Sequence, residues 1–66
     1  MSEIIEYAFY VEGDPPREVD GAEVVGVERV FGGWHKLVLR LPKDKIPLIA
    51  SRLRKTGLRL AKSANY

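Results

Sequence analysis

The chain has 66 residues, a net charge of +2 and no cysteine. This length allows one small domain over residues 1–66, and the lack of thiols excludes disulfides and thiolate metal sites. A single histidine, His35, excludes a multi-histidine metal site within one chain, so we expect no metal and no cofactor. Additional stability would then come from a partner, either a second copy, a larger assembly or nucleic acid.

The first ten residues carry acids where a signal peptide needs bases, and no apolar run is long enough to span a bilayer. We therefore expect a cytoplasmic protein without a membrane partner. Glu, Lys and Arg are abundant while Cys and Gln are absent, which is typical of a thermophile.

Charge is distributed unevenly along the chain. Every acidic residue except Asp44 lies before Phe31, and every basic residue except Arg17 and Arg29 lies after it. Such polarity indicates a basic surface that binds a polyanion. The alternative is that the two halves neutralise each other across paired strands.

Residues 4–11 predict the first strand, because Ile, Tyr, Phe and Val favour a pleated and half-buried surface. One face of this strand is wholly apolar or aromatic and is expected in the core; it consists of Ile5, Tyr7, Phe9 and Val11. Residues 12–21 contain two prolines and several turn-forming residues, which predicts a surface loop.

Residues 22–41 predict a β-hairpin with Gly32–Gly33 as its two-residue turn. An uninterrupted register puts Phe31 opposite Trp34 and Val30 opposite His35, and alternation then sorts the side chains into two faces. The face expected under a helix has Val24, Gly26, Glu28, Val30, His35, Leu37, Leu39 and Leu41, and Gly26 is expected to leave room for close helix approach. The other face has Val25, Val27, Arg29, Phe31, Trp34, Lys36, Val38 and Arg40.

A helix is predicted from Lys45 to Thr56, with Asp44 as its N-cap and Pro47 in its first turn. Its apolar residues follow the spacing of one buried stripe and are Ile46, Ile49, Ala50 and Leu53. Gly57 is suited to the position after the helix. Residues 58–61 alternate and predict a short fourth strand, followed by a tail over residues 62–66.

The predicted fold is therefore a small α+β domain of order β-β-β-α-β, with a mostly antiparallel sheet and one helix on one face. The first strand can lie between the third and fourth, antiparallel to both. One short helix covers only one face of such a sheet, so the other face is left for a ligand or a partner.

Interleaved aromatic and basic side chains on an open sheet suit nucleic acid, because rings stack on bases while Lys and Arg contact phosphates. The helix and the C-terminal half add a second group of bases. The predicted nucleic-acid-binding residues are Arg29, Phe31, Trp34, Lys36, Arg40, Lys45, Arg52, Arg54, Lys55, Arg59 and Lys62. We expect a small RNA-binding module, an accessory or structural component of a ribonucleoprotein such as the ribosome.

Other functions compete with this interpretation. The face with Val25, Val27, Phe31, Trp34 and Val38 also suits a homodimer or subunit interface, and a DNA-binding chromatin protein is a third hypothesis. Glu28 and His35, diagonal neighbours in the uninterrupted register, could form an acid–base pair. No nucleophile, metal cluster or phosphate loop accompanies them, so we expect no enzymatic activity.

Overall fold

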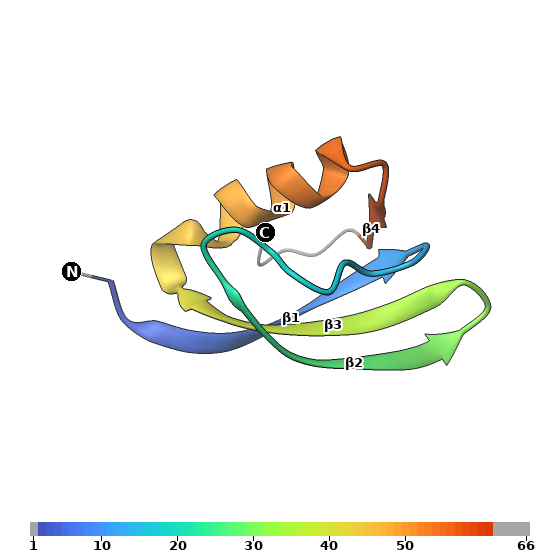
Figure 1. Ribbon diagram of the computed structural model, residues 1–66, viewed down its shortest axis with the longest axis horizontal. Helices are drawn as coiled ribbons and strands as arrows, with labels where there is room; N and C mark the ends of the chain where they lie inside the picture. The colour runs from blue at the N-terminus through green and yellow to red at the C-terminus, as the bar shows by residue number, and fades with distance from the viewer. Residues whose placement is uncertain (1, 62–66) are drawn as a thin grey trace.

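The structure, a computed structural model, describes residues 2–61, in which one helix lies across one side of a four-stranded sheet (Figure 1). The strands are β1 (Ile4–Glu12), β2 (Glu23–Phe31), β3 (Trp34–Pro42) and β4 (Arg59–Leu60). A short 3₁₀ turn, Lys43–Lys45, leads into the helix α1 (Ile46–Lys55). The predicted α+β class and the β-β-β-α-β order are confirmed.

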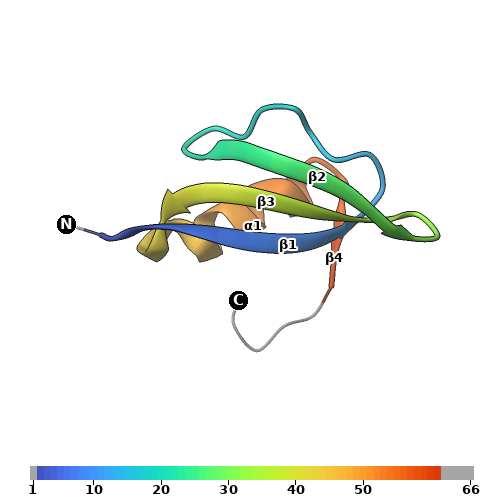
Figure 2. The same ribbon diagram turned by 90° about the horizontal axis from the view of Figure 1, so that it is seen from below.

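The strands lie in the order β2-β3-β1-β4, and each neighbouring pair is antiparallel (Figure 2). β1 therefore lies between β3 and β4, as expected. Its ladder with β3 runs without a shift from Ile4 opposite Pro42 to Glu12 opposite Trp34. This regular pairing places alternate residues of both strands under α1 and the others on the opposite side.

The core lies between α1 and the sheet. Phe9 and Val11 from β1 and Leu37, Leu39 and Leu41 from β3 are buried, as predicted from their alternation. The helix contributes its predicted stripe, Ile46, Ile49, Ala50 and Leu53. Each buried leucine is worth roughly 1.5–3 kcal/mol relative to an exposed one, so this layer supplies most of the stability of a small chain.

The segment between β1 and β2, predicted as a plain surface loop, also closes one side of the core. Val19 is buried and forms an isolated bridge with Ala22. Gly21 lies beside α1, where a Cβ would make an ordinary contact, 3.7 Å, with a methyl of Ile49. Packing against the helix, rather than regular strand pairing, holds this segment.

The start of the helix differs from the prediction. Lys45, not Asp44, occupies the N-cap of α1, and its side chain makes no capping hydrogen bond. The amide of Asp44 donates to Ser2 Oγ at 3.1 Å. The 3₁₀ turn before α1 explains the difference, because it shifts the helix start by one residue past the acid. Pro47 lies in the first turn of α1 as predicted.

β2 contains two irregularities that the uninterrupted register did not include. The pairing with β3 shifts between Arg29 and Phe31 and again between Val24 and Gly26, so Val30 and Val25 are extra residues. Such bulges set two residues of one strand against one of its partner. Arg29 therefore lies opposite His35 rather than Lys36.

The four residues between the bulges consequently exchange faces. Glu28 lies opposite Lys36 and Gly26 opposite Val38, while Val27 lies opposite Leu37. Directly opposed side chains share a face, so the predicted placement of residues 26–29 is wrong. Gly26 makes no room for the helix, since a Cβ there would meet no atom within 4 Å.

Candidate nucleic-acid interface

The hairpin turn brings the two most prominent aromatic side chains together. Gly32 has a φ of 55°, which glycine adopts without a Cβ clash, and Phe31 lies opposite Trp34 across the turn as predicted. The Gly33 carbonyl accepts a hydrogen bond from Gly13 N at 2.9 Å, which ties the turn to the end of β1. Phe31 is 68% exposed.

The side of the sheet away from α1, here called the open face, collects side chains from all four strands. Its members are Ile4, Glu6, Ala8, Tyr10 and Glu12 of β1; Glu23, Gly26, Glu28 and Phe31 of β2; Trp34, Lys36, Val38, Arg40 and Pro42 of β3; and Arg59 of β4. At its hairpin end is an apolar hollow of about 290 Å³, lined by Tyr10, Val30, Phe31, Trp34 and Ala61.

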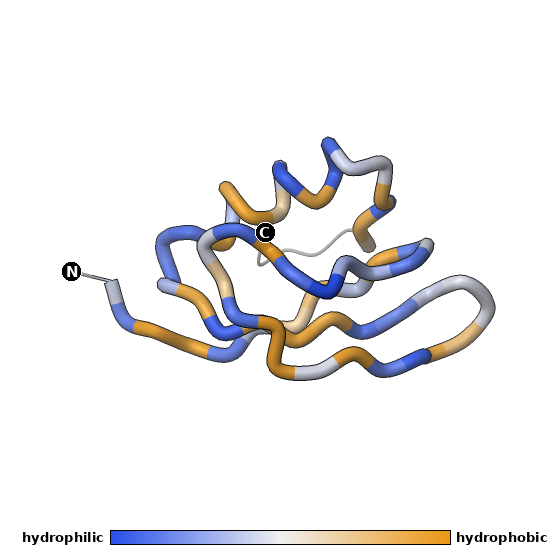
Figure 3. Tube along the Cα trace, viewed as in Figure 1, coloured by the Kyte–Doolittle hydropathy of each residue, from blue (hydrophilic) through white to orange (hydrophobic). Residues whose placement is uncertain are grey.

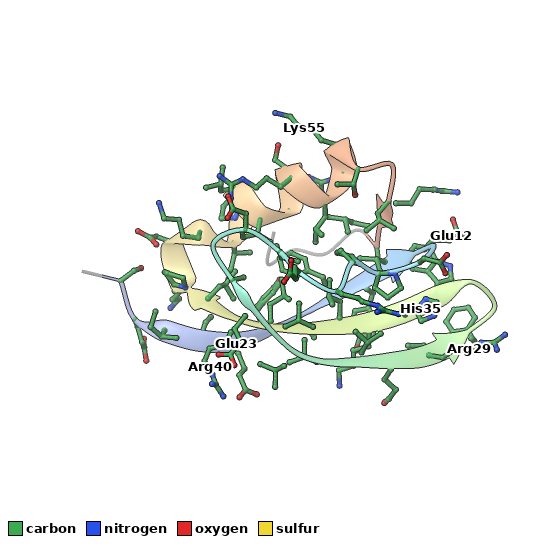
Figure 4. The ribbon with its side chains drawn as sticks, viewed as in Figure 1. Glu12, Glu23, Arg29, His35, Arg40 and Lys55 are labelled. Atoms are coloured by element: carbon green, nitrogen blue, oxygen red, sulfur yellow. The ribbon has the colours of Figure 1, made fainter. Side chains whose placement is uncertain are left out.

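The charges of the open face are largely paired with each other. Arg40 donates to Glu6 at 3.1 Å and to Glu23 at 3.2 Å (Figure 4). The hydrogen bond to Glu6, then the charge of Glu23, raise the pKa of Arg40 above its usual value. Arg59 lies 3.3 Å from Glu12. The open face therefore carries more acids than bases. On this face, acids from the first half of the chain neutralise bases from the second half.

The second basic group lies on the opposite side of the molecule. We call Lys43, Lys45, Arg52, Arg54 and Lys55 the basic helix surface; all are exposed, and Asp44 is the only acid in the segment they span. Figure 4 shows Lys55 pointing away from the sheet on the side of α1, whereas Arg40 and Glu23 lie on the other side. Figure 3 shows hydrophilic and hydrophobic positions alternating along this helix.

One residue of the basic helix surface is already held by the loop. Arg52 donates to the carbonyl oxygen of Asp20 at 2.8 Å and lies 3.7 Å from its carboxylate. Lys45, Arg54 and Lys55 form no salt bridge within residues 2–61. These three cations can therefore contact phosphates without first breaking an ion pair with a carboxylate.

The predicted site residues thus divide into separate groups. Phe31, Trp34, Lys36, Arg40 and Arg59 belong to the open face, whereas Lys45, Arg52, Arg54 and Lys55 belong to the basic helix surface. Arg29 is exposed on β2 and is opposite His35, not on the open face where it was predicted. Lys62 lies outside the described residues.

The hypothetical acid–base pair is not formed. Glu28 lies opposite Lys36, whose neighbour His35 points to the other face. His35 Nδ1 is buried and has no hydrogen-bond partner within the described part of the chain. Residues 2–61 also contain no group of three or more His, Asp or Glu side chains placed to hold a metal ion.

Two hollows on the surface escaped the sequence interpretation. Leu48 is 43% exposed in the middle of the basic helix surface, where it lines a shallow groove of about 280 Å³ with Lys45, Arg52 and the loop residues Asp20 and Gly21. Ala61 completes the apolar hollow from beyond β4. Both depend on contacts between distant segments, which periodicity alone does not predict.

Within residues 2–61, no helix combines the length and the apolar character needed to cross a membrane. Comparisons of this chain with protein-family models, with curated proteins and with solved structures find no match.

Proposed function

We propose that the chain is a small nucleic-acid-binding module that acts in the cytoplasm as an accessory or structural component of a ribonucleoprotein such as the ribosome, with RNA favoured over DNA. The observation that supports this proposal is the basic helix surface, in which Lys45, Arg54 and Lys55 are exposed and have no carboxylate partner within residues 2–61. Binding of this kind is dominated by phosphate contacts and positions the partner without reading its sequence.

The proposal assigns phosphate contacts to the helix side rather than to the open face. On the open face an incoming phosphate would meet Glu6, Glu23 and Glu12, which hold Arg40 and Arg59. Binding there would break existing ion pairs and bring like charges together. On α1 the last turn carries Arg54 and Lys55 without an acidic neighbour in the helix, so approach of a polyanion is favoured over the whole helix length of about 15 Å.

The chain allows a test with a closely matched control. The variant Lys45→Gln/Arg54→Gln/Lys55→Gln removes three cations without carboxylate partners. The control Lys36→Gln/Arg40→Gln/Arg59→Gln removes three cations of the open face, of which Arg40 and Arg59 are already held by carboxylates. Both change the net charge equally, so long-range attraction changes equally and the difference between them reports direct contacts.

RNA affinity is measured by fluorescence anisotropy over a range of salt concentrations. We expect the first variant to lose at least about tenfold in affinity and to reduce the salt slope by roughly one for each lost contact, whereas the control keeps most of both. The proposal is rejected if wild type does not bind structured RNA at low salt, or if the two variants lose affinity equally. Duplex DNA in parallel tests the chromatin hypothesis.

A protein-interaction module is the second candidate, and the apolar hollow favours it. Tyr10 and Phe31 expose large aromatic surface beside Trp34, and aromatic anchors of this type dominate protein interfaces. Trp34 is the only tryptophan, so its fluorescence discriminates between the two. Under the nucleic-acid proposal with helix-side binding, RNA leaves Trp34 emission unchanged; quenching would indicate base stacking on the hollow instead.

A further inference from the structure

The two outer edges of the sheet differ in how they are protected. β2 forms one edge and contains the two bulges at Val25 and Val30, together with three charged residues. Bulges and charges are the usual protection of an edge strand against pairing with another chain. On the other edge, β4 pairs within the described residues with only Val11 and Glu12 of β1, and Ala61 N donates to Tyr10 O at 2.9 Å.

Most of the outer edge of β1 has no strand beside it within the described residues. In an antiparallel ladder the backbone groups of successive residues point alternately to the two sides. Tyr10 points its carbonyl to β4, and the β1–β3 ladder has no shift. The backbone N–H and C=O of Ile4, Glu6 and Ala8 therefore point outward along an edge that has no bulge, no proline and no base from Ile4 to Tyr10. Figure 2 shows β1 along this margin of the sheet.

We propose that the outer edge of β1 pairs antiparallel with the same edge of a second copy of this chain, which joins two sheets into one. Such pairing is self-complementary, because each copy supplies the same outward donors and acceptors. This edge offers little to attract a charged strand of another protein. Glu6 is the only charged side chain from Ile4 to Tyr10, and it already forms an ion pair with Arg40 at 3.1 Å.

Three positions of the two-fold axis along the middle of this edge are compared, at Ile5, Glu6 and Tyr7. A two-fold centre at Tyr7 would require the backbone of Tyr10, which Ala61 already uses. A centre at Glu6 would put two carboxylates directly opposite each other, which is destabilising. A centre at Ile5 avoids both and places Ile4 opposite Glu6 of the second copy.

With this centre, the half-buried Ile5 side chains of the two copies meet on the α1 side, and the Ile4 side chains, each 58% exposed, become diagonal neighbours on the open face. The two-fold axis is perpendicular to the sheet, so both helices lie on the same side. The dimer thus carries two basic helix surfaces on one side.

Association is measured by sedimentation over a range of concentrations, with amide hydrogen exchange at Ile4, Glu6 and Ala8. We expect a mass twice the 7.5 kDa of one chain at high concentration, and protection of these amides that rises with concentration. Ile4→Pro removes one outward donor in each copy and should weaken association by about tenfold or more, whereas Ile4→Val keeps the donor and the dimer.

Cysteine cross-linking tests the register without a proline variant. The chain has no cysteine, so Ile5→Cys should form a disulfide-linked dimer under mild oxidation, while Glu28→Cys on β2 should not. A monomer up to about millimolar concentration, where even weak association is detected, overturns the proposal, as does equal association of Ile4→Pro and Ile4→Val. Edge protection that is independent of concentration and disappears when residues 62–66 are deleted would assign the edge to this chain's own end and also overturn it. None of these measurements involves nucleic acid.

Discussion

At the scale of single residues, a charge acts according to its immediate partner. Arg40 and Lys55 have the same sign, but Arg40 is divided between two carboxylates while Lys55 has no ion-pair partner within residues 2–61. Exposed ion pairs contribute little to stability. Their main consequence here is to cancel the field of the open face, which leaves α1 as the surface with net positive charge.

His35 provides a test at this scale. Its Nδ1 is buried without a hydrogen-bond partner in the described residues, and an unsatisfied buried polar atom is a cost that an apolar side chain of similar shape does not have. We expect the free energy of unfolding of His35→Phe to equal that of wild type or to exceed it by up to about 1 kcal/mol. A loss of several kcal/mol in urea unfolding would show that the imidazole has a partner that stabilises the fold.

At the scale of elements, the hairpin and the helix each contain a position where a substitution should destabilise the fold. Gly32 has a positive φ, whereas Gly33 does not. Leu53 of α1 is 2% exposed, whereas Leu48 on the same helix is 43% exposed. Each pair therefore provides a sensitive position and a matched control of the same residue type.

The turn is tested by alanine at each glycine. Gly32→Ala forces a Cβ into the left-handed region and should cost about 1–2 kcal/mol. Gly33→Ala adds a Cβ whose nearest neighbour is Glu12 Cγ at 3.8 Å, an ordinary contact, so little change is expected. Thermal unfolding of the two variants measures the difference, and equal losses would mean that the turn does not require glycine at its first position.

The helix is tested by the corresponding leucine pair. Leu53→Ala should destabilise the protein by about 2–5 kcal/mol, since it leaves a cavity between α1 and the sheet. Leu48→Ala should change stability by less than about 0.5 kcal/mol. Both are read from denaturant unfolding with circular dichroism. Similar effects of the two variants would place Leu48 in an interface rather than in solvent.

Elements with a regular period were predictable, and irregular ones were not. The stripe Ile46–Leu53 and the buried leucines of β3 follow from spacing alone, and both were confirmed. The bulges at Val25 and Val30 were not predictable, because a bulged valine looks like any other valine in a strand rich in valine. Each bulge nevertheless moves the residues beyond it to the opposite face of the sheet. Arg40 and its partner Glu6 are 34 residues apart, so their ion pair depends on the strand order.

At the scale of the whole molecule, the two candidate surfaces lie on opposite sides of the sheet. The chain is elongated, 38 × 20 × 20 Å, with the basic helix surface on one side and the apolar hollow on the other. The surface proposed for nucleic acid and the surface proposed for a protein partner therefore do not overlap. The site residues that were predicted as one group form two, one on the open face and one on the basic helix surface. The period of a β-strand assigns its residues to faces, but it does not tell which charges on the neighbouring strands will lie beside them.

Lysine footprinting tests this division. RNA bound to the helix side should protect Lys45 and Lys55 from acetylation several-fold, while Lys36 on the open face keeps its reactivity, because phosphate contacts exclude the reagent only where they form. Mass spectrometry of peptides with and without RNA measures all three in one sample. Protection of Lys36 alone would move the nucleic acid to the open face.

The place of β1 in the middle of the sheet also affects how the chain is made. β2 and β3 are neighbours in sequence and can pair as soon as both exist, but β1 is synthesised first and pairs with β3 about 30 residues later in the chain, as Ala8 opposite Val38 shows. Until β3 has left the ribosome, the segment IIEYAFYV has no strand to pair with. Contacts this distant slow folding and expose an apolar strand in the nascent chain. The first strand made therefore waits longest for its partner, and aggregation competes most strongly with folding during that wait.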